Sequence, residues 1–314
     1  MAKKILLSGI QPTGVPHIGN YFGMMKPMID LQNEYEIYAM IASYHALTTI
    51  TDPGVLQKNI NDVVIDFLAA GFDPEKVILF KQSDVPEHTE LTWIFNCLVT
   101  IAWLSRAHAF KDKTEKGLEA SIGLFDYPVL MTADILIYDT EVVPVGEDQR
   151  QHLEMAREVA RKFNAQYGDI FIEPKEMIKG EVAVVPGIDG QKMSKSYGNT
   201  ISLFATDEEI KKAVMSIVTD SSGDVPTNVY AIHKLFKSES ELKKLYEENN
   251  GKYKNLKDAL LVDILAFVTP MRERRKYYED HPELVAEILK KGGEKAKAKA
   301  EAKMKLVRQK VGLE

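Results

Sequence analysis

The chain has 314 residues, of which 45% are hydrophobic and 27% charged, with a net charge of −6, a composition typical of a globular protein with one large domain or two ordinary ones. Its single cysteine excludes an internal disulfide and a metal site built from several cysteines. No stretch reaches the roughly 18 to 20 apolar residues that a membrane-spanning helix needs, and no signal-peptide pattern is found, so we expect a cytoplasmic protein that makes no membrane contact.

Strand-like and helix-like segments alternate in the first two thirds of the chain. Short apolar runs predict strands at 4–8, 36–43, 76–81, 141–146 and 181–185. Apolar residues at helical spacing predict helices at 20–32, 53–71, 87–104 and 147–164. The apolar segment 124–138 reads as a further helix, which we expect to begin at Pro128. Such alternation indicates a parallel sheet whose ligands bind at the carboxyl ends of its strands.

For two further parts of this region the sequence predicts burial or exposure. Cys97 lies in the apolar part of the predicted 87–104 helix, which predicts a buried thiol. Segment 107–121 is polar and lysine-rich, so we expect it at the surface.

Beyond residue 206 the strand signals fade and only helices are predicted, at 207–217, 228–236, 239–249, 257–278 and 282–311. The charge balance changes at the same place: residues 1–206 hold 18 Lys and Arg against 27 Asp and Glu, and residues 207–314 hold 22 against 19. Basic clusters at 272–276 and along 290–310 can meet phosphates, although a solvated helix of mixed charge fits them equally well. The fold class is therefore α/β, a doubly wound parallel sheet followed by helices.

Two glycine-bordered segments carry phosphate-binding chemistry. In the segment 9–21 a strand ends in a glycine turn and a helix begins near His17, which is where free backbone amides attract phosphates. In the segment 190–199 the pentapeptide KMSKS presents ammonium and hydroxyl donors on what we expect to be a mobile loop rather than a packed element. Taken alone, either pattern is more often an ordinary turn or a solvated loop.

Together these segments resemble the two signatures of class I aminoacyl-tRNA synthetases, the HIGH motif in its His-Ile-Gly-Asn form and KMSKS. Segments 123–136 (GLFDYPVLMTADIL) and 143–154 (VPVGEDQRQHLE) are similar to the substrate-pocket segments of bacterial tryptophanyl-tRNA synthetases, and 9–14 and 110–113 fit the same family. The resemblance covers nearly the whole chain and implies a Rossmann-like catalytic domain.

The chemistry of Asp134 agrees with that resemblance. It lies in an apolar run, where an unpaired carboxylate would be costly. An indole has one N–H donor and no acceptor, so a carboxylate that accepts from it would reject phenylalanine. A helix carboxylate that is paired locally explains Asp134 equally well from the residues alone.

The resemblance implies roles for particular residues. The catalytic set comprises Thr13, His17, Lys113, Lys192 and Lys195. The ATP-binding set comprises Gln11, Pro12, Thr13, Gly19, Asn20, Gly146, Glu147, Asp148, Ala183, Val184, Lys192, Met193, Ser194, Lys195 and Ser196. The tryptophan-binding set comprises Leu7, Gly9, Tyr127, Met131, Asp134, Ile135, Val143, Val145 and Gln149. Within it, Tyr127 and Gln149 are implied to hold the α-amino group.

The implied activity is that of a tryptophan–tRNA ligase, which forms tryptophanyl-adenylate from tryptophan and ATP and then charges tRNA(Trp). Mg²⁺ is implied on the triphosphate, with no dedicated protein site, and the family is homodimeric. The implied domains are a catalytic domain at 1–200, a helical anticodon-binding domain at 201–290 and a C-terminal helix at 291–314 that packs back on the first.

Two departures from the family pattern and several alternatives stay open. Leu7 stands where many relatives have phenylalanine, and segment 185–191 differs from the common form. A tyrosyl-type synthetase shares the fold, but the context of Asp134 argues against it. A small-molecule nucleotidyltransferase would not need the basic helices. A non-catalytic RNA-binding paralogue is disfavoured because His17 and both KMSKS lysines are present.

Overall fold

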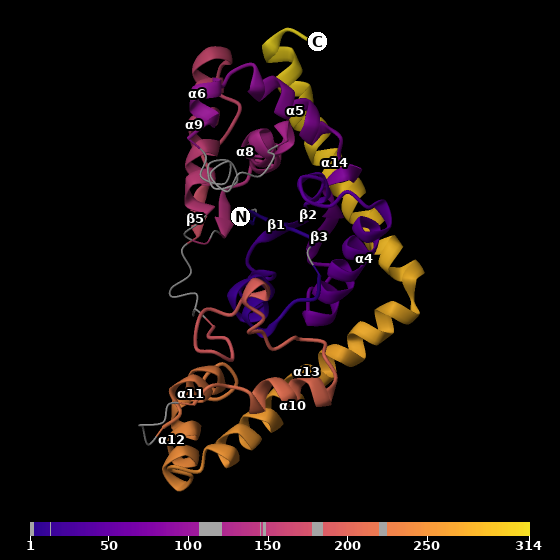
Figure 1. Ribbon diagram of the computed structural model, residues 1–314. Coiled ribbons are helices and arrows are strands. Elements are labelled where there is room, and N and C mark those ends of the chain that lie inside the picture. The colour runs from indigo at the N-terminus through magenta and orange to yellow at the C-terminus, as the bar shows by residue number, and fades with distance from the viewer. Residues whose placement is uncertain are drawn as a thin grey trace.

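The computed structural model describes residues 3–12, 14–106, 121–144, 146, 149–177, 185–219 and 225–314. At its centre is a five-stranded parallel sheet with the strand order β3-β2-β1-β4-β5. The strands are β1 (Ile5–Ile10), β2 (Glu36–Ile41), β3 (Val77–Lys81), β4 (Val142–Pro144) and β5 (Lys175–Met177). This sheet and the helices around it confirm the predicted fold class (Figure 1).

The helices and helical turns of the first part are α1 (Ile18–Asn20), η1 (Tyr21–Met25), α2 (Lys26–Leu31), α3 (Ser43–Ala46), α4 (Pro53–Ala70), η2 (Gln82–Asp84), α5 (Glu87–Asn96), α6 (Ile101–Leu104), α8 (Ile122–Leu136) and α9 (Arg150–Tyr167). Those that follow are η4 (Lys195–Tyr197), α10 (Asp207–Met215), α11 (Thr227–His233), α12 (Glu239–Glu248), α13 (Tyr253–Asp280) and α14 (Pro282–Val311). In the described part of the chain, no helix is long and apolar enough to cross a membrane.

Both faces of the sheet are buried, as expected for a doubly wound fold. Successive residues of a strand point to opposite faces, so Leu6 and Ile37 join one hydrophobic cluster and Leu7 and Tyr38 the other. The first cluster continues into the helical region beyond residue 206, and the second includes the inner side of α14. The two regions therefore share a core.

The predicted strands at 4–8, 36–43, 76–81 and 141–146 correspond to β1 to β4. The short strand β5 was not predicted, because its sequence Lys-Glu-Met has no apolar run. The predicted strand 181–185 lies outside the described residues except for Val185, and segment 107–121 lies outside them except for Ser121.

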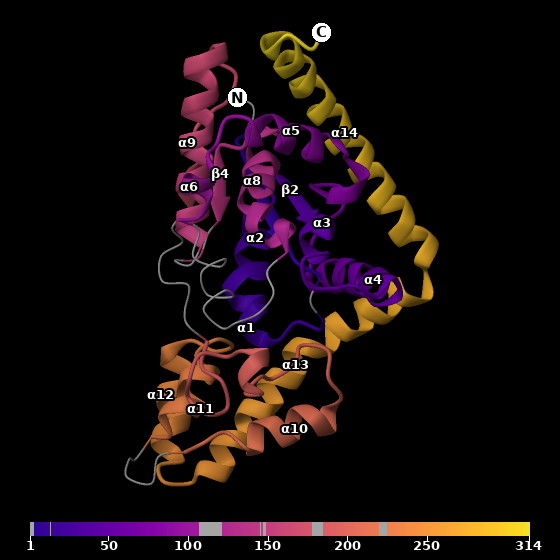
Figure 2. The ribbon, with the colours of Figure 1, turned by 45° about the horizontal axis from the view of Figure 1, so that its top comes forward.

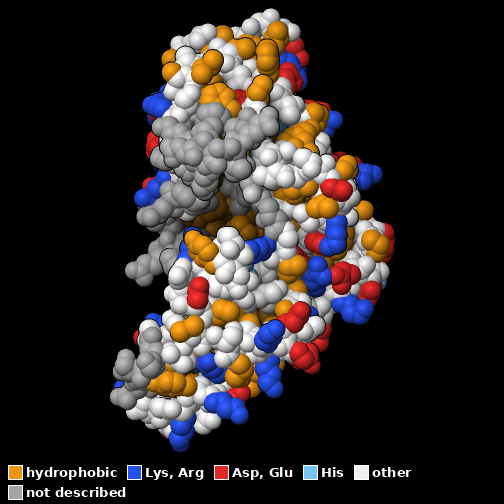
Figure 3. Space-filling model, viewed as in Figure 1, with side chains coloured by type: hydrophobic (Ala, Val, Ile, Leu, Met, Phe, Trp, Pro, Cys, Tyr) orange, Lys and Arg blue, Asp and Glu red, His pale blue; other side chains and the backbone are white. Residues whose placement is uncertain are grey.

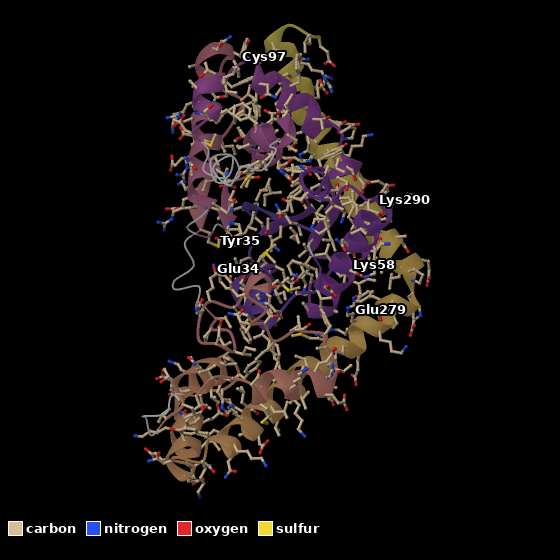
Figure 4. All side chains as sticks on the ribbon, viewed as in Figure 1. Glu34, Tyr35, Lys58, Cys97, Glu279 and Lys290 are labelled. Carbon is tan, nitrogen blue, oxygen red and sulfur yellow. The ribbon has the colours of Figure 1, made fainter. Side chains whose placement is uncertain are left out.

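The predicted helix 87–104 is wrong as a single helix. α5 ends at Asn96, and Thr100 begins α6 by accepting a hydrogen bond from the backbone N–H of Trp103. This break places Cys97 at the outer end of α5, where it is exposed rather than buried (Figure 4). An apolar run thus gave the wrong environment for the thiol, because the helix turns away from the core there.

The expected helix start at Pro128 is also wrong. α8 begins after Ser121, whose side chain accepts from the backbone N–H of Leu124. Pro128 lies inside the helix and is buried. The Thr132 hydroxyl donates to the Pro128 carbonyl at 2.8 Å, so both residues stay within the helix. α8 therefore begins at Ile122, well before the predicted start at Pro128.

Two long helices connect the helical region to the sheet (Figure 2). α13 packs against α4 and α10, and α14 runs beside the edge strand β3 and α5. The basic cluster on α13 makes intramolecular contacts: Arg274 donates to the Ala69 carbonyl, and Arg272 donates to the Ala205 carbonyl and Asp207. These two arginines attach α13 to its neighbours.

Candidate active site

A cavity of about 660 Å³ lies at the carboxyl ends of β1, β2 and β4, between α8 and the η1–α2 segment. Figure 3 shows a hollow near the middle of this face with hydrophobic side chains inside it. Ten of the predicted site residues line the cavity: Leu7, Gly9, Gln11, Tyr127, Met131, Asp134, Ile135, Val143, Gly146 and Gln149. Parallel strands end at one edge, so residues distant in sequence meet here.

The remaining predicted residues divide into two groups. Thr13, Lys113, Val145, Glu147, Asp148, Ala183 and Val184 lie outside the described residues. Pro12, His17, Gly19, Asn20, Lys192, Met193, Ser194, Lys195 and Ser196 are described but do not line the cavity. Most of this second group belongs to the two motif loops.

Asp134 is held at the cavity wall by three side chains that the sequence did not single out. His45 Nε2 lies 2.8 Å from Asp134 Oδ2, and Gln82 Nε2 donates to Oδ1 at 2.7 Å. His88 Nδ1 lies 2.6 Å from the same Oδ1, although its N–H direction is bent away from a straight hydrogen bond. We call these three side chains the Asp134 cage.

The ends of β2 and β3 determine the positions of two cage residues. His45 lies in α3, which begins at Ser43 soon after β2, and Gln82 directly follows β3. The Gln82 Oε1 atom accepts from the backbone N–H of Tyr44 at 3.0 Å, so its Nε2 must face Asp134. Polar residues just after two parallel strands are a signal that could have identified His45 and Gln82, but the partner of each could not be read from the sequence.

The cage keeps Asp134 ionised. Burial alone would raise the carboxyl pKa, but His88 and His45 outweigh it and hold the pKa at about 2. A carboxylate has about four acceptor positions, two on each oxygen. Gln82 and the close contact of His88 are both at Oδ1, whereas His45 alone is at Oδ2, so Oδ2 has one position left for a further donor.

Tyr127 lines the cavity from α8, and its hydroxyl lies 2.6 Å from Nε2 of the buried His152 on α9. Burial raises the pKa of Tyr127, so the phenol stays protonated at neutral pH. Gln149 stands at the start of α9 and lines the same cavity. These two side chains bring further polar groups to the cavity, and the Tyr127 ring lies edge-on to that of His45, with centroids 6.1 Å apart.

His17 begins α1 by a reciprocal capping interaction. Its Nδ1 accepts from the backbone N–H of Asn20 at 3.2 Å, and the Asn20 side chain accepts from the backbone N–H of His17 at 3.0 Å. Burial and the nearby Lys195 lower the His17 pKa to about 4. The ring is therefore neutral at pH 7, with its proton on Nε2.

The segment after KMSKS pairs with the glycine turn and so brings the two motifs together. Ile18 N–H donates to the Ile201 carbonyl, and Leu203 N–H donates to the Pro16 carbonyl, both at 3.0 Å. A Cβ at Gly19 would lie 3.3 Å from Met193 Cβ. A side chain at Gly19 would therefore require its neighbours to shift, which shows how closely the two segments pack there.

The KMSKS segment is packed against the rest of the protein, whereas we expected a mobile loop. Met193 is buried in the core, and its backbone N–H donates to the Val185 carbonyl. Ser194 N–H donates to Asn199 Oδ1, and Asn199 donates to the Lys192 carbonyl. The Lys195 side chain reaches the glycine turn, with Nζ 3.6 Å from the Cβ position at Gly14.

Among the described residues, no group of three or more His, Cys, Asp and Glu side chains is arranged to hold a metal ion.

Comparisons with known proteins agree with this geometry. The family described as tRNA synthetases class I (W and Y) matches residues 2–307. A tryptophan–tRNA ligase from Fusobacterium nucleatum is 48% identical over 98% of this chain and 97% of its own length. The structure of a tryptophanyl-tRNA synthetase from Campylobacter jejuni, complexed with ADP and tryptophan, is 44% identical and covers 98% of this chain and 100% of its own, with a TM-score of 0.93.

A third relative extends the comparison to lower identity. The tryptophanyl-tRNA synthetase from Mycoplasma pneumoniae is 29% identical, covers 100% of this chain and 99% of its own, and has a TM-score of 0.85. A family match over nearly the whole chain and a relative 48% identical along it lead to one conclusion: the chain belongs to the class I tRNA synthetases of the tryptophan and tyrosine (W and Y) family.

Proposed function

We propose that this protein is a tryptophan–tRNA ligase. The observation that carries the proposal is the buried, ionised Asp134, which lines a mostly apolar cavity and has one acceptor position left open on Oδ2. An indole N–H meets that requirement, because it is a single donor on a large apolar ring. The relatives named as tryptophan–tRNA ligases support the same substrate.

In the proposed complex the indole lies against Leu7, Met131, Ile135, Val143 and Val145, with Gly9 leaving room beside it. Tyr127 and Gln149 hold the α-amino group. Gln11 lies near the carboxylate that attacks the α-phosphate of ATP in line. Pyrophosphate leaves, and the 3′-terminal ribose hydroxyl of tRNA then attacks the adenylate carbonyl. Positioning and charge stabilisation supply the catalysis.

ATP binds between the two motif loops in this proposal. His17 donates from Nε2 to a phosphate oxygen, and Lys192, Lys195 and Lys113 neutralise the triphosphate, as the close approach of Lys195 to the glycine turn supports. Further contacts come from Pro12, Thr13, Gly19, Asn20, Met193, Ser194 and Ser196, from Gly146, Glu147 and Asp148 at the ribose, and from Ala183 and Val184 at the adenine. Mg²⁺ is carried by the phosphates and reduces their negative charge.

We further propose that the protein is a cytoplasmic homodimer. Three large apolar side chains are strongly exposed on α5, α6 and α8, helices that contact one another through α8: Trp93 at 71%, Ile101 at 79% and Ile122 at 85%. Large exposed apolar side chains favour an interface, and a second copy of the chain is the proposed partner. Sedimentation equilibrium of the wild type and of Ile101→Lys tests this, since the charge should release monomers.

The domain roles follow from the family. Residues 1–200 form the proposed catalytic domain, 201–290 recognise the anticodon of tRNA(Trp), and 291–314 fasten the two together. Loss of aminoacylation, with adenylate formation retained, is expected when exposed lysines of α12 such as Lys243 and Lys244 are changed to Glu.

Exchange of pyrophosphate into ATP, measured with each of the twenty amino acids, tests the activity. We expect exchange that depends on tryptophan, followed by charging of tRNA(Trp). Exchange that depends on tyrosine, which the breadth of the family allows, would replace the substrate assignment, and no exchange with any amino acid would overturn the proposal.

A further inference from the structure

We propose that His88 is a positioning residue for substrate selection: it holds Asp134 in the orientation that reserves one oxygen lone pair for an N–H donor. The inference rests on the proposed function and extends it to a side chain that does not touch the cavity. His88 is fully buried on α5 and does not line the cavity, so its effect must pass through Asp134.

The distances determine which ring nitrogen carries the proton. His88 Nδ1 lies 2.6 Å from Asp134 Oδ1, and two bare lone pairs would repel at that distance, so Nδ1 carries a proton even though its N–H points off the straight line to Oδ1. His88 Nε2 lies 2.7 Å from the hydroxyl of Tyr138. Nδ1 carries a proton in the charged ring and in one tautomer of the neutral ring. In the neutral ring, donation from the Tyr138 hydroxyl to Nε2 favours the tautomer whose N–H faces Asp134.

Packing holds this chain of contacts in place. Tyr138 is fully buried and stacks on Tyr38, with ring centroids 4.7 Å apart, while Phe80 packs edge-on to it. The His88 ring lies nearly parallel to that of Phe80, with centroids 6.5 Å apart, and 5.4 Å from that of Tyr138. Because these rings leave little freedom for rotation, the direction of the His88 Nδ1 atom is set by the core.

The orientation of the carboxylate follows. Gln82 and His88 both occupy Oδ1, whereas His45 alone occupies Oδ2. Loss of the His88 contact would free a lone pair on Oδ1 and let the carboxylate rotate. The open acceptor position on Asp134 Oδ2 would then no longer point at the indole N–H. As a result, kcat/KM for a substrate with an N–H donor would exceed that for a substrate without one by a smaller factor.

A pair of substrates separates this role from general damage to the fold. Tryptophan has the N–H donor, and β-(3-benzothienyl)alanine has nearly the same shape with sulfur in its place. The readout is the ratio of kcat/KM for the two amino acids in pyrophosphate exchange. Damage to the fold lowers both values together, whereas misplacement of Asp134 lowers the value for tryptophan alone.

The variants are chosen to distinguish the two His88 contacts. His88→Leu removes both contacts and should lower the ratio about 10- to 100-fold, the usual effect of a lost hydrogen bond to a charged group. His88→Asn keeps an amide donor near the Nδ1 position, so its ratio should stay within a few-fold of the wild type. Tyr138→Phe keeps the ring but loses the tautomer-selecting hydroxyl, so the ratio should fall while the fold is preserved.

The helical region provides a matched control. His233 is likewise fully buried and contacts an aspartate and a tyrosine: Nε2 lies 2.8 Å from Asp263 Oδ2, and Nδ1 lies 3.2 Å from the Tyr246 hydroxyl. His233→Leu removes the same kind of buried contacts far from the cavity, so we expect reduced stability with an unchanged ratio.

The outcomes differ for the two proposals. A wild-type enzyme that shows no tryptophan-dependent exchange would contradict the proposed function itself. A normal wild-type enzyme whose ratio is unchanged in His88→Leu and in Tyr138→Phe would overturn only the role of His88. If His88→Leu does not fold, Tyr138→Phe decides alone.

Discussion

Arg275 donates a hydrogen bond from Nε to Asp66 Oδ1 at 2.7 Å, and the pair joins α13 to α4 across the two regions of the molecule. Asp66 is fully buried, and its Oδ2 has no hydrogen-bond partner among the described residues. Burial raises the Asp66 pKa to about 6 even though Arg275 opposes the shift. The ionised carboxylate is therefore costly at this interface.

This pair gives the protein a pH-dependent stability with a defined sign. The Asp66 pKa is higher in the folded protein than its usual value of 3.8. The contribution of Asp66 to the free energy of unfolding is therefore fully present below pH 3.8 and is lost as the pH rises to about 6. We expect the free energy of unfolding of the wild type, relative to Asp66→Asn, to fall by up to about 3 kcal/mol across that window. Urea denaturation at several pH values measures it.

The exposed Asp30, which pairs with Lys26, provides the control, since Asp30→Asn should leave the pH profile unchanged. If the free energy of unfolding of the wild type, relative to that of Asp66→Asn, instead rises with pH, the attraction of Arg275 for the Asp66 carboxylate exceeds the cost of its burial.

Asp134→Ala should lower kcat/KM for tryptophan by at least about 100-fold, because a charge-assisted hydrogen bond to the indole is lost. Asp134→Asn should be similarly harmful, because its amide donor would face the donors of the cage. The KM for ATP should change little. Asp126→Asn on the same helix is the matched control, since Asp126 pairs with Asn96 and does not line the cavity. Tryptophan activation that survives Asp134→Ala would remove the indole assignment.

Gly19→Ala should impair the use of ATP. The added Cβ would lie 2.9 Å from His17 Nδ1 and 3.3 Å from Met193 Cβ, so the two motif loops must separate. We expect kcat/KM for ATP to fall about 10-fold or more, since small displacements in an active site have large effects on rate. Gly123→Ala is the control, because its nearest neighbour lies 3.9 Å away. An unchanged ATP dependence would show that the loops tolerate the separation.

Gly292→Ala should destabilise the protein although alanine is favoured in a helix by roughly 1 kcal/mol. The added Cβ would lie 1.9 Å from the Leu79 carbonyl oxygen, which is backbone and cannot rotate away. We expect a loss of about 1–3 kcal/mol in the free energy of unfolding. Gly293→Ala meets only the Asp84 side chain at 3.3 Å, so its loss should be smaller. A stabilised Gly292→Ala would show that α14 can shift away from β3.

The sequence was sufficient to predict those strands, helices and site residues that depend on local sequence patterns. The apolar runs gave β1 to β4, and α14 has the predicted bounds, because Pro282 fixes its start and Gly312, in the left-handed conformation, ends it. Ten of the predicted site residues line one cavity because they lie in β1 or β4, shortly after one of these strands, or on α8. Periodicity and turn chemistry specify such features directly.

Features that depend on distant partners could not be predicted. The Asp134 cage joins residues from three elements, and nothing in the sequence near His88 indicates its partner. The arginines of α13 suggested either phosphate contacts or a solvated helix of mixed charge, yet Arg275 and Arg274 bind α4. Cys97 was misplaced for the same reason, because an apolar run does not show where a helix leaves the core.

The position of α14 has a consequence for the order of folding. β3 is an edge strand, and exposed edges pair readily with other chains. α14 covers that edge, but it begins at Pro282, whereas β3 ends at Lys81. During synthesis the edge of β3 therefore stays uncovered until α14 has been made. Nascent chains that stall before α14 should be the form most dependent on chaperones.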